Sequence, residues 1–226
     1  MEKTDSLEEF DWINEGYQLP SQLNEKATIQ NLLPSFDSYF KLLHPIFTCE
    51  TKGSGQETRE AGRVHWKDLA QRYGIQFVPQ IDWWTFVNNK AFIEDQMPEK
   101  LFGPNEGNLD ESALTLLRNI LTDHITENEK IYFCYWLLAR EDIVENSVEW
   151  VLYRGTLGEV QKSNRIHISK FSPTFWWPES KQWCVYTDFD WSFTFIGGSK
   201  ELIKQLSGHH DMEGFIIENQ THIFSK

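Results

Sequence analysis

Cysteine is scarce in this chain of 226 residues. Only three are present, Cys49, Cys134 and Cys184, and they are widely separated. An odd number at these spacings predicts no disulfide framework, and no two cysteines have the short spacing of a paired-cysteine zinc site. Two of the three stand among aromatic residues, which is typical of buried free thiols in a reducing compartment. We therefore expect a cytoplasmic protein.

The sequence also has no long apolar run and has fewer basic than acidic residues. The longest apolar run, Ile131 to Ala139, is far too short to span a bilayer, and the acidic first residues contain no apolar segment of a secretory signal. Lysine and arginine number 21 against 34 acidic residues, a formal net charge of −13. This charge repels phosphate backbones and anionic lipids, so we expect neither nucleic acid nor membrane as a partner. It suits a basic protein partner, although simple solubility explains it as well.

Recognisable catalytic and cofactor motifs are missing too. Gly197-Gly198-Ser199 has neither the further glycines of a dinucleotide site nor the spacing of a phosphate loop, so a turn and a helix cap explain it. His209-His210-Asp211 has the residue types of a metal site, but neighbouring residues rarely converge on one ion without a sharply turned backbone. We expect a solvated loop there, and we predict no metal and no cofactor.

Tryptophan is abundant instead, with ten residues, several of them between Phe175 and Phe195. Rings of this size must be buried or must bind something. Trp176-Trp177-Pro178-Glu179 is the strongest candidate binding element, because rings beside a proline turn can stay exposed and stack on a ligand. Trp83-Trp84 is a second candidate pair. The alternative is structural, with successive rings on opposite sides of a sheet.

The order of patterns along the chain predicts an α+β fold in a single domain, residues 1–226. We expect an antiparallel, aromatic-rich sheet in the C-terminal half, packed against helices mainly from the N-terminal half. Residues 1–20 are predicted to form an acidic N-terminal arm, with apolar side chains that could dock on the body. The polar, glycine-containing stretch 48–62 is predicted to be an exposed loop.

Three helices are well specified. Trp66, Leu69, Ala70 and Tyr73 share one helical face, and Gly74 stands where a left-handed cap belongs. Asp110 is a natural N-cap for a helix with a stripe formed by Leu114, Leu117, Leu121 and Ile125. A third helix is predicted over 200–207, after the Gly-Gly-Ser turn.

Strand patterns begin at residue 130. Residues 131–138 predict a central strand covered on both faces, and further strands are expected over 148–153, 165–168 and 182–187. Between Trp183 and Phe195 the apolar residues are mostly odd-numbered, which favours a hairpin around Phe189 that pairs Val185 with Phe193. One long bulged strand is the alternative.

Asp188 and Asp190 are the candidate acids of this hairpin. Two carboxylates on one face of a strand can raise each other's pKa and serve acid/base chemistry. Turn positions explain the pair as well, because aspartate accepts hydrogen bonds from local backbone amides. The turn interpretation is the better supported of the two.

Several of these segments together resemble a group of uncharacterised bacterial proteins. The resemblance depends on Trp176-Trp177-Pro178-Glu179, Trp183-Cys184-Val185 and Ile196-Gly197-Gly198-Ser199, with weaker support from 106–109 and 133–136. It covers mainly residues 100–206. It implies a cytoplasmic bacterial protein and supplies no activity.

The leading functional hypothesis is a non-enzymatic binding protein that recognises a macromolecular partner, with an immunity-type or inhibitor-like role as one form. The alternative is a hydrolase-like enzyme that uses Asp188 or Asp190 in an aromatic-walled cleft. Sugar binding by exposed Trp176 or Trp177 is a third hypothesis. The sequence leaves the oligomeric state open.

Overall fold

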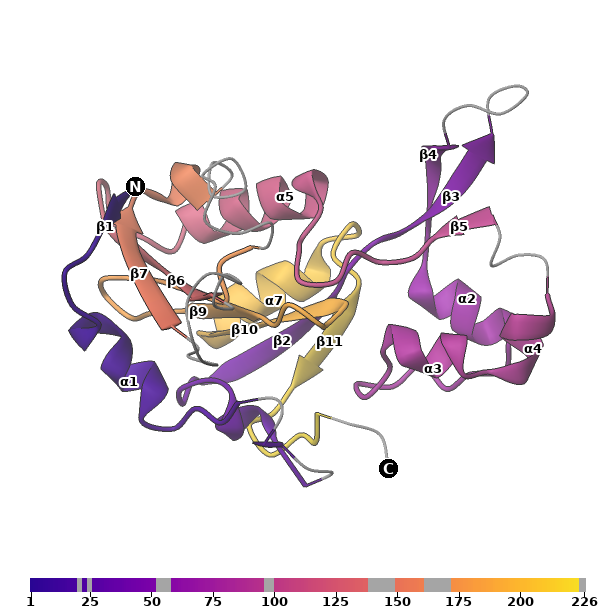
Figure 1. Cartoon of the computed structure of the whole chain (residues 1–226), viewed down its shortest axis with the longest axis horizontal. Helices are drawn as coiled ribbons and strands as arrows, with labels where there is room; N and C mark the ends of the chain where they lie inside the picture. Colours follow the sequence, from indigo (N-terminus) through magenta and orange to yellow (C-terminus); the bar gives the residue numbers. More distant parts are fainter. Residues whose placement is uncertain are drawn as a thin grey trace, which may run out of the picture.

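The computed structural model describes residues 1–19, 22–23, 26–51, 58–95, 100–137, 149–160 and 172–223. These residues form an α+β fold with antiparallel sheets, as predicted, arranged as a large lobe and a small lobe (Figure 1). No helix in this part of the chain is long and apolar enough to cross a membrane.

The large lobe is built on an eight-stranded sheet in the order β1-β7-β6-β8-β9-β10-β2-β11, with every neighbouring pair antiparallel. The strands are β1 (Glu2–Lys3), β2 (Ser38–Leu43), β6 (Ile131–Leu137), β7 (Glu149–Gly155), β8 (Phe175–Pro178), β9 (Cys184–Thr187), β10 (Phe193–Gly198) and β11 (Gly214–Ile217). The predicted central strand β6 pairs on both of its edges. The strand predicted over 165–168 lies outside the described residues.

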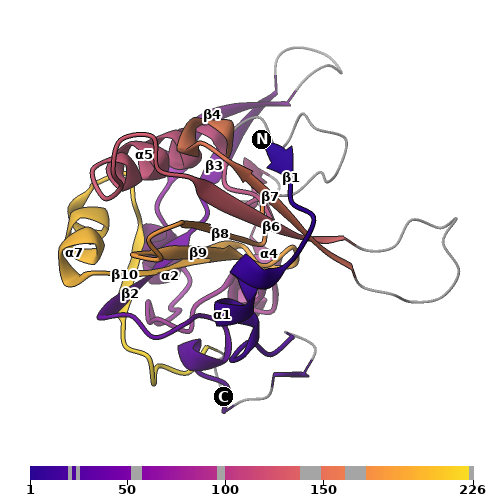
Figure 2. The same cartoon turned by 90° about the vertical axis from the view of Figure 1, so that its left-hand side faces the viewer.

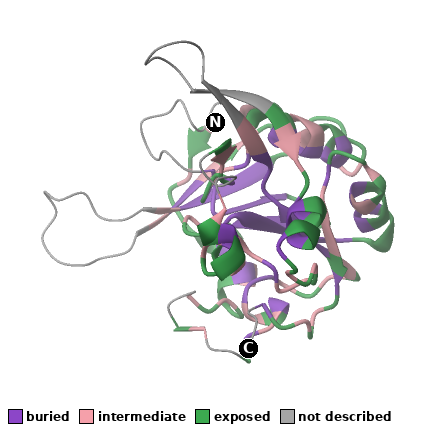
Figure 3. Cartoon of the chain, turned by 90° about the vertical axis from the view of Figure 1, so that its right-hand side faces the viewer, coloured by how far each residue is buried: buried purple, intermediate pink, exposed green. Residues whose placement is uncertain are grey.

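Each face of the sheet carries its own core. The helices α5 (Glu111–Thr122), η5 (Leu157–Glu159) and α7 (Lys200–Gly208) cover one face, where Phe133, Val185 and Ile196 are buried. The N-terminal segments η1 (Glu8–Phe10), α1 (Asp11–Asn14) and η3 (Ile29–Asn31) cover the other. Figure 2 shows α5 and α7 on one side of the sheet and α1 on the other, and Figure 3 shows the buried residues concentrated on the central strands.

The predicted N-terminal arm is docked on the large lobe through its apolar residues. Phe10 and Ile13 are 1% and 2% exposed, and β1 pairs with β7. The rings of Phe10 and Phe175 lie 5.5 Å apart. Burial of these two side chains fixes the arm against the sheet despite its acidic composition.

The hairpin prediction is confirmed in its topology and wrong in its register. β9 and β10 pair antiparallel, but Val185 faces Ile196 and not Phe193. The prediction assumed one solvated face, whereas all residues of both strands are buried. Helices cover one side and the N-terminal arm covers the other, so the alternation of apolar and polar residues does not determine the register.

The small lobe is formed by elements between β2 and α5 in the sequence. A three-stranded sheet, β4-β3-β5, stands beside three short helices (Figure 1). Its elements are β3 (Ile46–Thr51), β4 (Thr58–Val64), α2 (Trp66–Arg72), α3 (Trp83–Val87), α4 (Lys90–Glu94) and β5 (Leu101–Phe102). The predicted helix before Gly74 is confirmed, with Gly74 at φ +64°.

The prediction of a loop over 48–62 is wrong for both of its ends. Residues up to Thr51 and from Thr58 onward are strands that pair antiparallel, from Ile46 opposite Val64 to Thr51 opposite Thr58, with a register shift between Phe47 and Cys49. Strand pairing needs backbone groups and not an apolar face, so a polar sequence can form such a ribbon. The centre of the stretch, 52–57, lies outside the described residues.

Several polar contacts join the two lobes. The ammonium of Lys41, on β2, donates to the carbonyls of Pro79 at 2.9 Å and Ile81 at 2.8 Å. The indole N–H of Trp66 donates to the carbonyl of His44 at 2.8 Å. The carboxylate of Glu213 accepts from the first two amides of α2, each at 2.9 Å. Because these donors and acceptors are satisfied across the junction, the junction is a defined surface.

Candidate functional site

A hollow of about 890 Å³ opens where the two lobes meet. We call it the interlobe groove. Three segments line it: the exposed side of α5, the base of the β3–β4 ribbon, and the turn that follows α7. The lining residues are Phe47, Arg63, Glu111, Ser112, Ala113, Thr115, Leu116, Asn119, His209, His210 and Asp211.

The α5 wall is set by the start and the stripe of that helix. The Asp110 side chain accepts from the amides of Ser112 at 2.9 Å and Ala113 at 3.2 Å, which is the predicted N-cap. The predicted stripe is buried against the sheet at Leu114, Leu117 and Leu121. The opposite side, with Glu111, Thr115 and Asn119 one turn apart, therefore faces the groove.

The ribbon contributes Phe47 and Arg63, which face each other across β3 and β4. One guanidinium nitrogen of Arg63, Nη1, donates to the backbone carbonyl of Asp211 at 2.5 Å. The other two nitrogens, Nε and Nη2, are buried and have no hydrogen-bond partner among the described residues. Buried donors of this kind are rare in folded proteins, so this edge of the guanidinium is an unsatisfied part of the groove wall.

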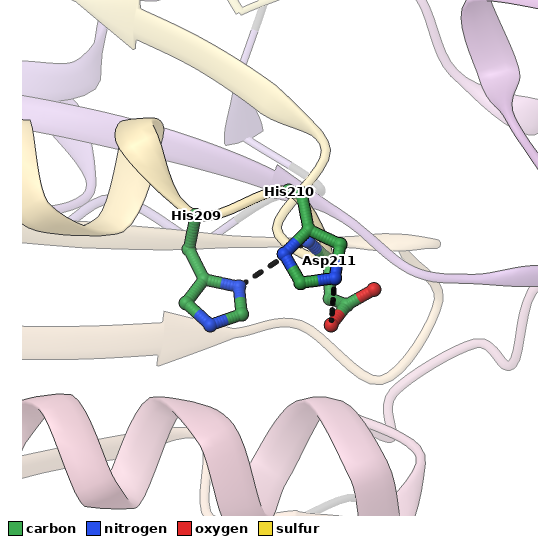
Figure 4. Close-up of side chains that lie close together, drawn as sticks. All are labelled: His209, His210 and Asp211. Carbon is green, nitrogen blue, oxygen red and sulfur yellow. Dashed lines mark hydrogen bonds and ion pairs between the residues drawn. The ribbon is translucent and has the colours of Figure 1, made fainter.

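The third wall is the turn that connects α7 to β11 (Figure 4). The amide of Met212 donates to the carbonyl of His209 at 2.9 Å and so closes a tight turn around His210 and Asp211. The predicted connecting loop is confirmed. The turn also brings one ligand atom from each of His209, His210 and Asp211 to within 4.8 Å of one another, which the sequence interpretation did not expect.

Side-chain contacts within this turn are local. His210 Nε2 lies 3.0 Å from Asp211 Oδ2, and the Asp211 amide donates to His209 Nδ1 at 3.2 Å. The two imidazole rings stack at 4.9 Å between centroids (Figure 4). His210 is 84% exposed and Asp211 51% exposed, so both side chains point toward solvent.

The predicted binding rings Trp176 and Trp177 are buried, at 1% and 0% exposure. Trp176 belongs to the core under α5 and α7, and Trp177 to the core under the N-terminal arm. The structural alternative of rings on opposite sides of a sheet is the one observed, and neither ring is exposed for a ligand to stack on. Glu179 is exposed and lines a separate small hollow beside residues 126–129.

The two tryptophans of the second predicted pair, Trp83 and Trp84, differ in their burial. Trp83 is half-buried and packs edge-on against Trp66 and Phe92, with centroid distances of 6.1 and 5.6 Å. Trp84 is 61% exposed. It lies on α3 and does not line the interlobe groove.

Asp188 and Asp190 form a turn, as the structural interpretation predicted. The Asp190 amide donates to Asp188 Oδ1 at 3.0 Å, and the Tyr186 hydroxyl donates to Asp188 Oδ2 at 3.2 Å. Asp188 is 1% exposed, and burial raises its pKa to about 6. Asp190 is exposed, and partial burial raises its pKa. Neither carboxylate lines the interlobe groove, so the pair offers a substrate no approach through it.

Two buried ionisable groups, one on β2 and one just after it, were not predicted from the sequence. Lys41 is 1% exposed, its ammonium lies 3.9 Å from the centroid of the Phe193 ring, and burial lowers its pKa to about 7. His44 is fully buried, and burial lowers its pKa to about 4. The only available signal was their place within an apolar run, residues 39–46.

The hydrogen bonds of His44 fix its tautomer. Nδ1 lies 2.5 Å from the carbonyl of Asn105, which can only accept, so Nδ1 carries the proton. Nε2 then accepts from the Thr194 hydroxyl at 2.9 Å, and that hydroxyl accepts from Thr187 at 2.8 Å. Every polar atom of the ring is satisfied internally, which identifies His44 as a structural residue.

Comparison with models of known protein families, with curated proteins and with solved structures finds no match.

Proposed function

We propose that this chain is a non-enzymatic binding protein that recognises a protein partner through the interlobe groove, in an immunity-type or inhibitor-like role in the cytoplasm. The observation that carries the proposal is the groove itself: a hollow of about 890 Å³ lined by apolar, acidic and basic side chains. Protein interfaces combine these kinds of residue, with an apolar centre and a polar rim.

The Arg63 guanidinium supports a partner that brings hydrogen-bond acceptors. Its Nε and Nη2 donors lie unsatisfied in the groove wall. Both donor atoms are buried in the free chain, so an acceptor oxygen from a docked polypeptide would bond them only after the Arg63 side chain turns toward the groove. Such a turn would relieve the cost of leaving two buried donors unpaired.

Charge supports a basic partner. The chain carries a formal net charge of −13, and Glu111 and Asp211 place two carboxylates at the groove. A field of one sign steers an oppositely charged protein toward its docking surface and accelerates association at low salt. Simple solubility remains the competing explanation of the charge, and the experiment below separates the two.

The hydrolase alternative has less support. A general acid or base must reach the substrate, and the raised pKa of Asp188 belongs to a carboxylate that is 1% exposed and already bonded to Tyr186 and Asp190. A raised pKa from burial alone is common in structural residues.

The test is affinity capture from a lysate of the source cells with the wild-type chain, Glu111→Lys and Glu201→Lys. Glu111 and Glu201 both stand in the first turn of a helix, but only Glu111 lines the groove. The two variants therefore change net charge and helix stability in the same way. We expect the wild type and Glu201→Lys to retain the same partner protein in a saturable way that weakens as the salt concentration rises. Glu111→Lys should retain at least tenfold less of this protein.

Two outcomes would contradict the proposal. One is recovery of the wild type as a lone monomer at every salt concentration. The other is equal retention by the two lysine variants, which would show that any captured protein is held by net charge and not by the groove.

A further inference from the structure

We infer that the turn His209-His210-Asp211 is a binding site for a divalent transition metal ion of the zinc type, with one coordination position open to the interlobe groove. The inference is independent of the proposed partner. It starts from the gathering of two imidazoles and a carboxylate, with one ligand atom of each within 4.8 Å of the others.

The backbone supplies what three consecutive residues ordinarily lack. Neighbouring side chains diverge in a helix or an extended strand. Here α7 ends at Gly208, and the bond from the Met212 amide to the His209 carbonyl, 2.9 Å long, folds the next residues into a tight turn. The turn directs all three side chains to the same side (Figure 4).

The ligand chemistry matches zinc. Neutral imidazole nitrogen and carboxylate oxygen bind Zn²⁺ at about 2.0–2.2 Å, which places ligand atoms roughly 3.4 Å apart in a tetrahedral site. The observed separations of up to 4.8 Å exceed this by an amount that side-chain rotation covers. Imidazole with carboxylate is also a set that selects against Mg²⁺ and Ca²⁺, which prefer oxygen alone.

Two rearrangements accompany binding. The imidazole rings are stacked at an interplanar angle of 18°, so His210 must turn for both rings to point at one ion. His210 is 84% exposed and nothing encloses it, so this rotation meets no packing. The His209 Nδ1 lone pair, which now accepts from the Asp211 amide at 3.2 Å, is the lone pair that the ion would take.

The surroundings decide how the site is used. Glu111 adds a negative charge to the same groove, whereas Arg63 bonds the backbone carbonyl of Asp211 and not its carboxylate. The carboxylate contacts His210 Nε2 at 3.0 Å, a contact that the ion would replace. Three protein ligands fill three of the four positions of a tetrahedral zinc ion, and the fourth stays open to water or to an incoming ligand. Because these residues line the groove, the open position faces a hollow of about 890 Å³.

The experiment is calorimetric titration of the untagged, chelator-treated chain with Zn²⁺, repeated for His210→Ala, Asp211→Asn and His222→Ala. His222 is exposed and lies outside the cluster, so it is the matched control for a lost surface imidazole. We expect one saturable site in the wild type and at least a tenfold weaker Kd in His210→Ala. For Asp211→Asn we expect a loss of several fold, and for His222→Ala less than a twofold change.

A second readout identifies the ligands directly. Nitrogen NMR of the imidazoles should show Zn²⁺-dependent shifts at His209 and His210 and none at His222. Three results would overturn the inference: no saturable binding by the wild type, equal Kd values for His210→Ala and the wild type, or an unchanged Kd in Asp211→Asn. Since His210→Ala alters an exposed side chain, misfolding does not obscure the result.

Discussion

At the scale of single residues, the described part of the chain buries a lysine, a histidine and an aspartate. Burial lowers the pKa of Lys41 to about 7 and of His44 to about 4, and it raises the pKa of Asp188 to about 6. In each case burial favours the neutral form. Each group is held by hydrogen bonds that an uncharged side chain can also make, so their burial is compatible with a stable fold.

Between about pH 4 and pH 6, His44 and Asp188 have opposite effects on how the unfolding free energy changes with pH. The unfolded chain binds the His44 proton more tightly than the folded chain, so this term makes stability rise with pH. The folded chain binds the Asp188 proton more tightly than the unfolded chain, so that term makes stability fall with pH. The two slopes offset each other in the wild type.

Asp188→Asn should separate the contributions of Asp188 and His44 to the pH dependence of stability. Asparagine keeps the acceptor for the Asp190 amide and can donate to the Tyr186 oxygen, so the turn survives. The difference in unfolding free energy between variant and wild type should grow in favour of the variant as pH rises from about 3.5 to 7. The expected change is on the order of 3 kcal/mol, from a pKa raised from 3.8 to about 6.

Urea denaturation at half-unit pH steps measures this difference. Asp190→Asn, at an exposed position of the same turn, is the comparison variant and should change the pH profile in the same direction but less, because only partial burial raises the pKa of Asp190. If the unfolding free energies of Asp188→Asn and the wild type differ by the same amount at every pH, burial does not favour the neutral form of Asp188 in the folded chain.

The structural features that were predicted best from the sequence are those that depend on residues close together in the chain. The Asp110 cap, the left-handed Gly74 and the Asp188–Asp190 turn were all predicted from local sequence, because each is a backbone hydrogen bond or dihedral within a few residues. The burial of Lys41 was not predicted, because its partners are carbonyls 38 and 40 residues away in the small lobe.

At the scale of elements, the sheet shows why strand existence was easier to predict than strand register. Composition identified β6, β7 and β9 because aromatic and branched residues favour strands. The register could be predicted only if one face of the sheet were buried and the other solvated, but both faces of this sheet are buried. Cys184 and Val185 are both at 0% exposure although they point to opposite sides.

The contact between β11 and β2 leaves no room for a side chain at Gly214 and gives the next prediction. A Cβ on Gly214 would lie 2.0 Å from the Lys41 carbonyl oxygen and 2.8 Å from Phe40 Cζ. Gly214→Ala should therefore displace β11 and lower the unfolding free energy by about 3 kcal/mol. Gly208, at the end of α7, has no heavy atom within 4 Å of the corresponding Cβ position.

Gly208→Ala is the matched control. Alanine loses less backbone entropy on folding, so this variant should be as stable as the wild type or more stable by about 0.5 kcal/mol. Thermal and urea unfolding of both variants tests the pair. Equal stabilities for Gly214→Ala and Gly208→Ala would mean that β11 is not held against β2 as described.

At the scale of the whole molecule, function is proposed at the junction of the lobes, where sequence patterns gave least guidance. The interlobe groove draws Phe47 and Arg63 from the ribbon, six residues from α5, and three from the turn after α7. These segments span more than 160 positions of the chain. Periodicity predicted α5 and α7 separately, but only the fold brings their exposed sides together with the ribbon.

The junction itself is the subject of the last prediction. Lys41 links β2 to the segment before α3 through the carbonyls of Pro79 and Ile81. Lys41→Met keeps the apolar stem and removes both hydrogen bonds, which takes the lysine donor away from one buried and one partly buried carbonyl. We expect a loss of about 2 kcal/mol in unfolding free energy, together with a local loosening of the small lobe where it contacts the large one.

Hydrogen exchange followed by mass spectrometry resolves the two effects. In Lys41→Met the Ile81 amide, which now donates to the Val78 carbonyl at 2.9 Å, should exchange about tenfold faster, while the paired amides of β6 and β7 keep their protection. Lys67→Met, at an exposed position of α2, is the control and should leave both regions unchanged. Faster exchange spread evenly over both lobes would contradict a local joint, because it would mean that Lys41 stabilises the fold as a whole and does not hold the small lobe in place.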